Sequence, residues 1–154
     1  LREVGVNVIE SPNNVHVVGK KKIRAVDIYA SAPYPAFQSD MQPIFATLMS
    51  IANGKSVITD SVFEKRFAYA SELRKLGANI IVKGNSAVIK GEKELTGTNV
   101  TSSDIRQGAA LGLAGLVARG ETIVGEVHHI DRAYERIEEK LRSLGAKIRR
   151  IRAK

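Results

Sequence analysis

The ten residues LRKLGANIIV, Leu73–Val82, occur in two further versions along this chain. LREVGVNVIE forms its beginning at Leu1–Glu10, and LRSLGAKIRR lies near its end at Leu141–Arg150. The shared motif starts at positions 1, 73 and 141, so the copies lie 72 and 68 residues apart. This period is longer than that of the common solenoid repeats. It predicts a supersecondary unit that is duplicated within one domain.

A second repeat lies between these motifs and adds a helix and a strand to each unit. SDMQPIFATLMSIANGKSVITD begins at Ser39, and SDIRQGAALGLAGLVARGETIVGE begins at Ser103. Each starts with helix-capping residue types and continues through an apolar helical run and a Gly to a β-branched strand. The second unit is predicted to begin with strands at Asn79–Val82 and Ala87–Lys90, joined by a Gly84-Asn85 turn, and Leu95–Thr101 is a candidate for a further strand. A helix from Ser103 or Asp104 to about Ala118, a strand at Thr122–Gly125 and a helix at about Asp131–Leu144 are predicted to follow. Alternation of strands and helices predicts an α/β domain with some parallel pairing.

The apolar helical runs indicate an unusual order of layers. Gln107–Ala118, QGAALGLAGLVA, has no charged residue and is apolar nearly all round, and Ile44–Ala52 is similar. A helix of this kind is buried on every side. Its glycines, Gly108 among them, would let a neighbour approach the backbone closely. Arg132–Leu144 is instead amphipathic, so the pattern predicts two central helices with the sheets outside.

The first copy of the motif lacks the element that precedes the other two. FEKRFAYASE and HIDRAYERIEEK read as helices before Leu73 and Leu141, whereas nothing stands before Leu1. We therefore expect a fragment of a longer protein, a single partial domain over 1–154 with units at about 1–72 and 73–141 and a closing strand at 145–151. Alternatively, the first helix was never present.

Composition excludes several classes of protein. The 154 residues are 44% hydrophobic, which suffices for a substantial core, and no Cys is available for a disulfide, a thiolate metal site or a nucleophile. His128 and His129 have no third ligand nearby, so no metal site is predicted, and no phosphate-binding glycine loop is present. No apolar run is long enough for a membrane span and no signal-peptide pattern occurs, so we expect a cytoplasmic protein.

The formal charge of +8 makes nucleic acid a candidate partner. Much of the excess lies in Lys20–Arg24 and Lys147–Lys154, and neither run contains an aromatic residue on which a base could stack. Solubilising charge on exposed segments is therefore the favoured interpretation.

Three short segments carry candidate site residues. In PYPAFQSDMQ, from Pro33, Asp40 or Ser39 either caps a helix or supplies a carboxylate beside free N–H groups that bind an anion. In SDIR, Arg106 follows the cap residue Asp104, and a cation there is unfavourable unless it meets an anion. Arg132 in IDRAYER stands in the same relation to the cap Asp131, and Arg66 is its counterpart in the preceding unit. Such arginines suit carboxylate and phosphate groups, although most helical arginines are merely solvated.

These segments resemble one family closely. PYPAFQSDMQ, TDSVFEKRF, LRKLGANI, SSDIRQGAAL, LAGLVARGET and HIDRAYERIEEKLRSLGA are similar to the C-terminal part of the UDP-N-acetylglucosamine 1-carboxyvinyltransferase (MurA, enolpyruvyl transferase) family, from Leu1 to about Ile151. The last run separates it from the sister 5-enolpyruvylshikimate-3-phosphate synthases. The resemblance implies an inside-out α/β barrel of three βαβαββ-type units with buried central helices, of which this chain holds about two.

The resemblance also implies an activity, the transfer of enolpyruvyl from phosphoenolpyruvate to the 3-hydroxyl of UDP-N-acetylglucosamine. This is the first committed step of peptidoglycan synthesis; phosphate leaves by addition–elimination, and no cofactor is implied. The corresponding positions are Asp40 as candidate general base, Asp104 as a second carboxylate at the reacting centre, Val62 and Phe63 against the sugar nucleotide, and Arg66, Arg106 and Arg132 around phosphoenolpyruvate. Which carboxylate is the base stays open. The family's reactive Cys and its phosphoenolpyruvate Lys belong to the partner domain, so the isolated chain is expected to be inactive.

Two other functions are weighed against the transferase. One is a basic nucleic-acid-binding module, and the other is a non-catalytic repeat module that keeps the fold alone. For the transferase we expect both substrates as partners, no nucleic acid and no membrane, with self-association through apolar surface as a further possibility.

Overall fold

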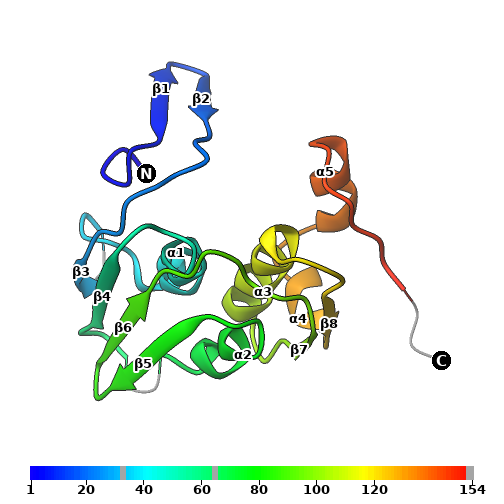
Figure 1. Ribbon diagram of the computed structural model, residues 1–154. Coiled ribbons are helices and arrows are strands. Elements are labelled where there is room, and N and C mark those ends of the chain that lie inside the picture. Colours follow the sequence, from blue (N-terminus) through cyan, green and yellow to red (C-terminus); the bar gives the residue numbers. More distant parts are fainter. Residues whose placement is uncertain (32–33, 64–65, 152–154) are drawn as a thin grey trace.

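The computed structural model describes residues 1–31, 34–63 and 66–151 (Figure 1). Pro33, at the head of the first candidate segment, lies outside the described residues. In chain order the elements are β1 (Asn7–Ser11), β2 (Asn14–Val18), β3 (Ile28–Ser31), η1 (Ser39–Met41), α1 (Gln42–Met49), β4 (Lys55–Asp60), α2 (Tyr69–Lys75), β5 (Asn79–Lys83), β6 (Ser86–Lys90), β7 (Asn99–Thr101), α3 (Ile105–Val117), β8 (Ile123–Gly125), α4 (His128–Asp131) and α5 (Ile137–Ser143).

The described strands form three sheets. β1 and β2 make a separate antiparallel hairpin, the central sheet has the order β3-β4-β6-β5, and β7 pairs with β8. The predicted hairpin is confirmed as β5–β6, with Ile80 opposite Ile89 and Gly84 at φ +57° in the turn. A positive φ at this first turn position suits glycine, which has no Cβ to clash. β3 runs parallel to β4, and β7 runs parallel to β8, so the prediction of some parallel pairing is also confirmed.

Two helices lie in the middle of the molecule. Figure 1 shows α1 and α3 between the four-stranded sheet and the small β7–β8 sheet. Their contact includes a hydrogen bond of 3.2 Å from Thr47 Oγ1 to the carbonyl oxygen of Ala110, and both residues are buried. At Gly108 an added Cβ would lie 2.4 Å from Ile130 Cγ1, so the missing side chain lets α4 approach α3. Nowhere in the described ranges is a helix long and apolar enough to cross a membrane.

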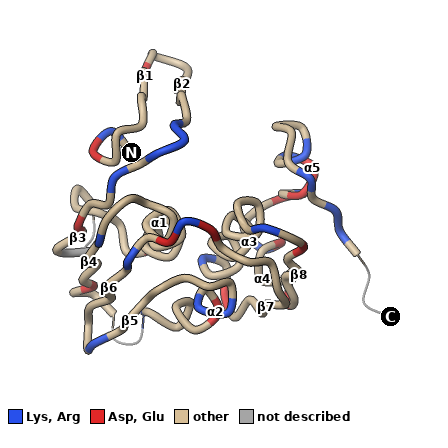
Figure 2. Tube along the Cα trace, viewed as in Figure 1, with Lys and Arg blue, Asp and Glu red and all other residues tan. Residues whose placement is uncertain are grey.

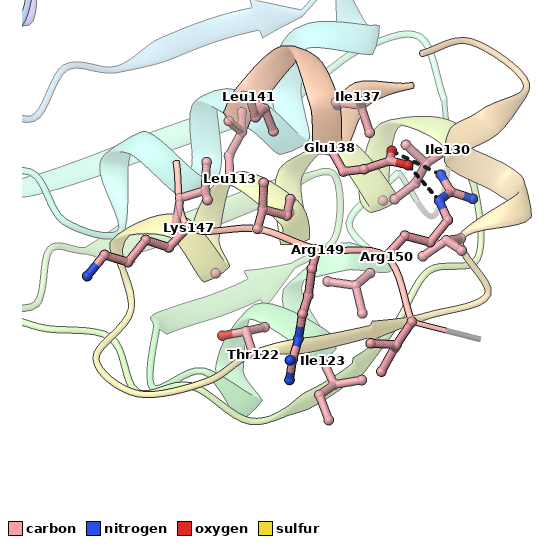
Figure 3. A pocket seen from close by; sticks show the side chains of 18 of the residues that line it. Leu113, Thr122, Ile123, Ile130, Ile137, Glu138, Leu141, Lys147, Arg149 and Arg150 are labelled. Carbon is pink, nitrogen blue, oxygen red and sulfur yellow. Dashed lines mark hydrogen bonds and ion pairs between the residues drawn. The ribbon is translucent and has the colours of Figure 1, made fainter. Parts of the chain in front are cut away.

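The prediction that α3 is buried on every side is wrong for one face. Ala110, Leu111 and Ala114 are buried, but Leu116 is 36% exposed and Val117 is 50% exposed. The uncovered face borders an apolar cavity of about 590 Å³ whose other walls come from β8, α5 and residues 147–151 (Figure 3). The reason is that β8, α5 and residues 147–151 lie across this cavity and leave part of the helix exposed, so the described chain does not bury all of its apolar surface.

The single helix predicted over Asp131–Leu144 is also wrong, because the chain forms two short helices there. α4 ends at Asp131, and Arg136, just before α5, has φ +47°, which a right-handed helix cannot contain. No residue of α5 is buried, and Leu144 is 83% exposed. Since helices in proteins depend mostly on burying their apolar face, a continuous helix here lacks the contacts that would support it.

The closing strand expected at 145–151 differs from the structure, in which these residues pair with no described strand. A strand needs the open edge of a neighbour, and this segment instead lies along the cavity beside α3. Arg150 holds it there by donating to Asp131 at 2.6 and 2.8 Å and to Glu138 at 2.8 Å. These hydrogen bonds from Arg150 lower the pKa of both carboxyl groups. The unit boundaries at about 1–72 and 73–141 stay a prediction.

Candidate functional site

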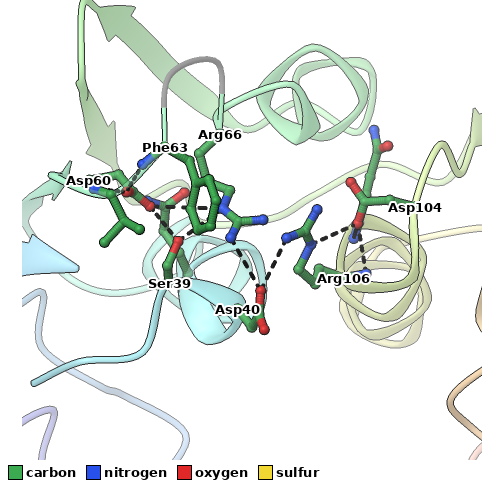
Figure 4. A network of polar contacts seen from close by, with 10 residues as sticks. Ser39, Asp40, Asp60, Phe63, Arg66, Asp104 and Arg106 are labelled. Carbon is green, nitrogen blue, oxygen red and sulfur yellow. Dashed lines mark hydrogen bonds and ion pairs between the residues drawn. The ribbon is translucent and has the colours of Figure 1, made fainter. Parts of the chain in front are cut away.

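A buried carboxylate at the end of β4 organises the candidate site (Figure 4). The Asp60 side chain is fully buried, and its Oδ2 accepts hydrogen bonds from Ser39 Oγ at 2.6 Å and Gln42 Nε2 at 3.0 Å. Its Oδ1 accepts from the backbone N–H groups of Val62 and Phe63 at 2.8 and 3.0 Å. Asp60 therefore ties the start of the η1–α1 segment to the loop that follows β4.

Arg66 is held at this loop by several neighbours. Its side chain is only 9% exposed, and its Nε donates to Ser39 Oγ at 2.9 Å. The same nitrogen lies 4.0 Å from Asp60 Oδ2, and the guanidinium carbon lies 4.0 Å from the centre of the Phe63 ring, within cation–π distance. A charge this far from solvent needs such partners, so the guanidinium group has little freedom to turn.

Arg106 is positioned by the helix cap that the sequence predicted. Asp104 is the N-cap of α3, and its Oδ1 accepts the backbone N–H of Arg106 at 2.8 Å and that of Gln107 at 3.0 Å. The same oxygen also accepts from Arg106 Nε at 3.1 Å. Asp104 thus satisfies free N–H groups at the helix start and offsets the unfavourable position of the Arg106 charge.

Asp40 contacts both arginines, although Arg106 lies 66 residues further along the sequence. Its Oδ1 accepts from Arg66 Nη2 at 3.3 Å and from Arg106 Nη1 at 3.1 Å, and its side chain is 70% exposed. Neither η1 nor α1 has a side-chain cap hydrogen bond, so the interpretation of Ser39 or Asp40 as a simple helix cap is wrong. The reason is that Ser39 is turned to Asp60 and Asp40 to the arginines.

A cavity of about 170 Å³ lies beside this network, lined by Phe63, Arg66, Tyr69, Asp104 and Arg106 among others. The phenol oxygen of Tyr69 is buried and has no hydrogen-bond partner among the described residues. Burial, with a further contribution from the Asp60 charge, raises the pKa of Tyr69, which therefore stays a neutral donor. Two guanidinium groups and a phenol can recognise a carboxylate or phosphate group of this size.

The structure brings together most of the residues that the sequence singled out. Asp40, Phe63, Arg66, Asp104 and Arg106 surround one site, and Val62 contributes through its backbone N–H. Arg132, directly after α4, is exposed, and its side chain forms no hydrogen bond or ion pair with the described residues, so the structure does not add it to this group.

Sequence reasoning missed Asp60 and Tyr69. One signal could have indicated Asp60: in the stretch SVITD it is an acidic residue at the end of a β-branched run. An acidic residue at that position lies where the strand leaves the sheet. Nothing in the sequence marks Tyr69, because its role follows from burial. Within the ranges that the structure covers, no three His, Cys, Asp or Glu side chains gather as a metal site would require.

Comparison with known proteins identifies the class to which this fold and site belong. The family model of EPSP synthase (3-phosphoshikimate 1-carboxyvinyltransferase) matches residues 1–141, so the chain belongs to this family of enolpyruvyl transferases. Within it, the sequence is 50% identical over 153 residues to the UDP-N-acetylglucosamine 1-carboxyvinyltransferase of Anaeromyxobacter sp. and 45% identical over 151 residues to that of Thermodesulfovibrio yellowstonii. The resemblance to that group is thereby confirmed.

These alignments cover 99% and 98% of this chain but 36% of each relative, so the chain spans about a third of the length of the curated relatives it matches. Among solved structures, the enolpyruvyl transferase NikO from Streptomyces tendae superposes with a TM-score of 0.87 at 32% identity, over 96% of this chain and 34% of that one. EPSP synthase from Acinetobacter baumannii, at 21% identity and a TM-score of 0.69 over 97% and 35%, shows the shared fold alone. The predicted α/β class is confirmed as an EPSP synthase-like fold, and closure of a barrel stays a prediction.

Proposed function

We propose that this chain forms one side of the active site of an enolpyruvyl transferase that moves the enolpyruvyl group of phosphoenolpyruvate to the 3-hydroxyl of UDP-N-acetylglucosamine. The observation that carries this proposal is the convergence of Arg66 and Arg106 on the exposed Asp40 carboxylate beside a small cavity. The similarity to UDP-N-acetylglucosamine 1-carboxyvinyltransferases names the substrates. In the cell the reaction would begin peptidoglycan synthesis.

In this proposal the two arginines bind the carboxylate and phosphate groups of phosphoenolpyruvate. Guanidinium groups held in place before the substrate arrives stabilise negative charge without reorganising, which is where such sites gain most of their rate. Phe63 packs on Arg66, and the Val62 and Phe63 loop would also face the sugar nucleotide. Arg132 would reach the anion only in a closed arrangement with the rest of the enzyme, which is consistent with its free, exposed position.

Asp40 is the proposed general base. It accepts the proton of the sugar 3-hydroxyl while the hydroxyl oxygen bonds to C2 of phosphoenolpyruvate and C3 of the opened double bond takes up a proton. Loss of a proton from C3 then restores the double bond as phosphate leaves C2. Its high exposure leaves Asp40 within reach of a substrate hydroxyl, which is the first requirement of a base. Asp104 is the proposed second carboxylate at the reacting centre, although here it also caps α3. The chain contains no Cys, so the family's reactive Cys must come from another part of the enzyme.

The experiment is a phosphate-release assay with both substrates, on the full-length protein encoded around this segment and on the 154-residue chain alone. We expect turnover by the full-length protein, none by the isolated chain, and a loss of roughly 100-fold or more in Asp40→Asn and Arg106→Gln. Arg119→Gln serves as the matched control, because Arg119 is exposed and outside the site. A full-length protein without turnover, or an Asp40→Asn variant with full activity, contradicts the proposal.

The charge distribution does not favour the nucleic-acid alternative. Figure 2 shows the basic run after β2 and the basic tail after α5 on separate sides of the molecule. Arg149 and Arg150 in the tail are also paired with carboxylates. A nucleic-acid module predicts tight binding to any polyanion that weakens steeply with salt, which a titration at several salt concentrations would reveal.

Three further expectations remain proposals. The fold would close into an inside-out barrel once a third unit is present. The protein would be cytoplasmic. Self-association through the exposed apolar surface of the isolated chain is tested by light scattering, where a monodisperse monomer counts against it.

A further inference from the structure

We propose that Asp40 acts as an internal stand-in for the substrate anion: in the empty site its carboxylate occupies Arg66 and Arg106, and an incoming phosphate or carboxylate group displaces it. The displaced Asp40 is then free to accept a proton. This inference rests on the proposed function, because it concerns the order of events at the same site. It assigns to Asp40 a second role besides that of general base: until the anion has bound, its carboxylate stays paired with the two arginines.

The two arginines keep their positions without Asp40. Arg66 is fixed by Ser39, by the nearby Asp60 and by the face of Phe63, and it is almost fully buried. Arg106 is fixed by Asp104 through Nε. In each case the atom that reaches Asp40 is a terminal Nη, at the end of the guanidinium group away from these supports. The pair therefore forms a prearranged anion site whose present occupant is Asp40.

Asp40 is the loosely held member of the network. It is 70% exposed, it belongs to a three-residue 3-10 turn, and it makes no capping hydrogen bond. Both of its contacts with the arginines use one oxygen, Oδ1, at 3.1 and 3.3 Å, so neither is the two-oxygen bidentate arrangement that makes arginine–carboxylate pairs strong. Because the Asp40 carboxylate is largely exposed, water screens both ion pairs, and each holds Asp40 only weakly. Releasing Asp40 thus costs less than moving either arginine.

The charges of the network favour exchange over simple addition. Three carboxylates, those of Asp40, Asp60 and Asp104, face the two guanidinium groups, so the empty network already has an excess of negative charge. An anion that entered the adjoining cavity while Asp40 stayed in place would meet like charge at close range. Departure of Asp40 removes that repulsion and frees both Nη atoms for the anion. Release of the Asp40 carboxylate from the arginines is in this way coupled to binding of the anion.

The test measures binding of inorganic phosphate to the 154-residue chain by NMR, at constant ionic strength, from the side-chain Nε–H signals of Arg66 and Arg106. Replacement of the internal competitor by a neutral isostere, Asp40→Asn, should tighten phosphate binding by roughly fivefold, the factor expected for removing a unit charge about 4 Å from the anion in water. Glu94→Gln removes the same charge from an exposed position outside the site and should leave the affinity unchanged. Arg106→Gln should abolish binding.

The outcomes separate this inference from the proposed function. Tighter binding in Asp40→Asn, with Glu94→Gln unchanged, supports the exchange. Equal or weaker binding in Asp40→Asn, together with loss of binding in Arg106→Gln, overturns the exchange and leaves the enolpyruvyl transferase proposal standing. Phosphate binding that survives Arg106→Gln, or no binding by any variant, overturns the exchange as well. The phosphate-release assay on the full-length protein then decides the proposed function independently.

Discussion

Removal of the Asp60 carboxylate should be among the most damaging single changes in this chain. Asp60→Ala leaves Ser39 Oγ and Gln42 Nε2 without their acceptor in a fully buried position, at about 1 to 3 kcal/mol each. The N–H groups of Val62 and Phe63 are partly buried, and water can reach them, so their loss adds less, about 0.5 kcal/mol each. The expected decrease in the free energy of unfolding for the four lost hydrogen bonds together is therefore about 3 to 7 kcal/mol.

Asp60→Asn is a milder change, because Gln42 has a second buried atom, Oε1, that has no hydrogen-bond partner among the described residues. Rotation of the Gln42 amide would present Oε1 to the new side-chain NH2 group and recover part of the loss. We expect a cost of about 1 to 2 kcal/mol for this variant. Asp104→Ala, which removes an ordinary helix cap, should cost about 1 kcal/mol and serves as the reference.

The measurement is chemical denaturation of the three variants and the unchanged chain at pH 7, followed by circular dichroism and analysed with a common slope. The order Asp60→Ala, Asp60→Asn, Asp104→Ala, from most to least destabilised, supports the reasoning. A cost below about 1 kcal/mol for Asp60→Ala would refute it, because the network would then not depend on this carboxylate. Phosphate binding by the Asp60→Asn variant shows whether Arg66 keeps its position.

Two further predictions concern the far side of the molecule. Gly108→Ala places a Cβ 2.4 Å from Ile130 Cγ1 and should destabilise the fold by about 1 to 3 kcal/mol in the same denaturation assay, whereas Gly112→Ala meets nothing within 4 Å and should stabilise α3 by up to about 1 kcal/mol. Because Arg150 lowers the pKa of Asp131 and Glu138, their contribution is present at neutral pH and is lost as the pH falls below about 4, when the carboxylates gain protons. Heteronuclear NOE measurements by NMR should then show residues 145–151 ordered at pH 6 and mobile at pH 3, and equal order at both pH values would contradict this.

Local signals in the sequence were sufficient for the elements that depend on few residues. The Gly84-Asn85 turn joins β5 to β6, and Asp104 caps α3, because the turn and the cap each involve atoms within a few residues of one another. The repeat and the apolar helical runs likewise predicted the α/β class and the central position of α1 and α3. The amphipathic periodicity gave a wrong prediction at residues 132–136, because the apolar face that it indicates is not buried by other described residues.

The site depended on tertiary structure throughout. Asp40 lies 26 residues from Arg66 and 66 residues from Arg106 in the sequence. No sequence pattern over such a separation predicts that both arginines donate to the same oxygen atom of Asp40. Without the resemblance to a known family, Asp40 would have been assigned as a helix cap, because residue type alone favours that role. Burial made Asp60 the centre of the network, and burial is a property of the packed chain. The sequence by itself therefore determined the features that local contacts fix, such as the β5–β6 turn and the cap of α3, because their atoms lie within a few residues of one another. Packing decided which charges meet and which of the predicted elements near the end of the chain did not form.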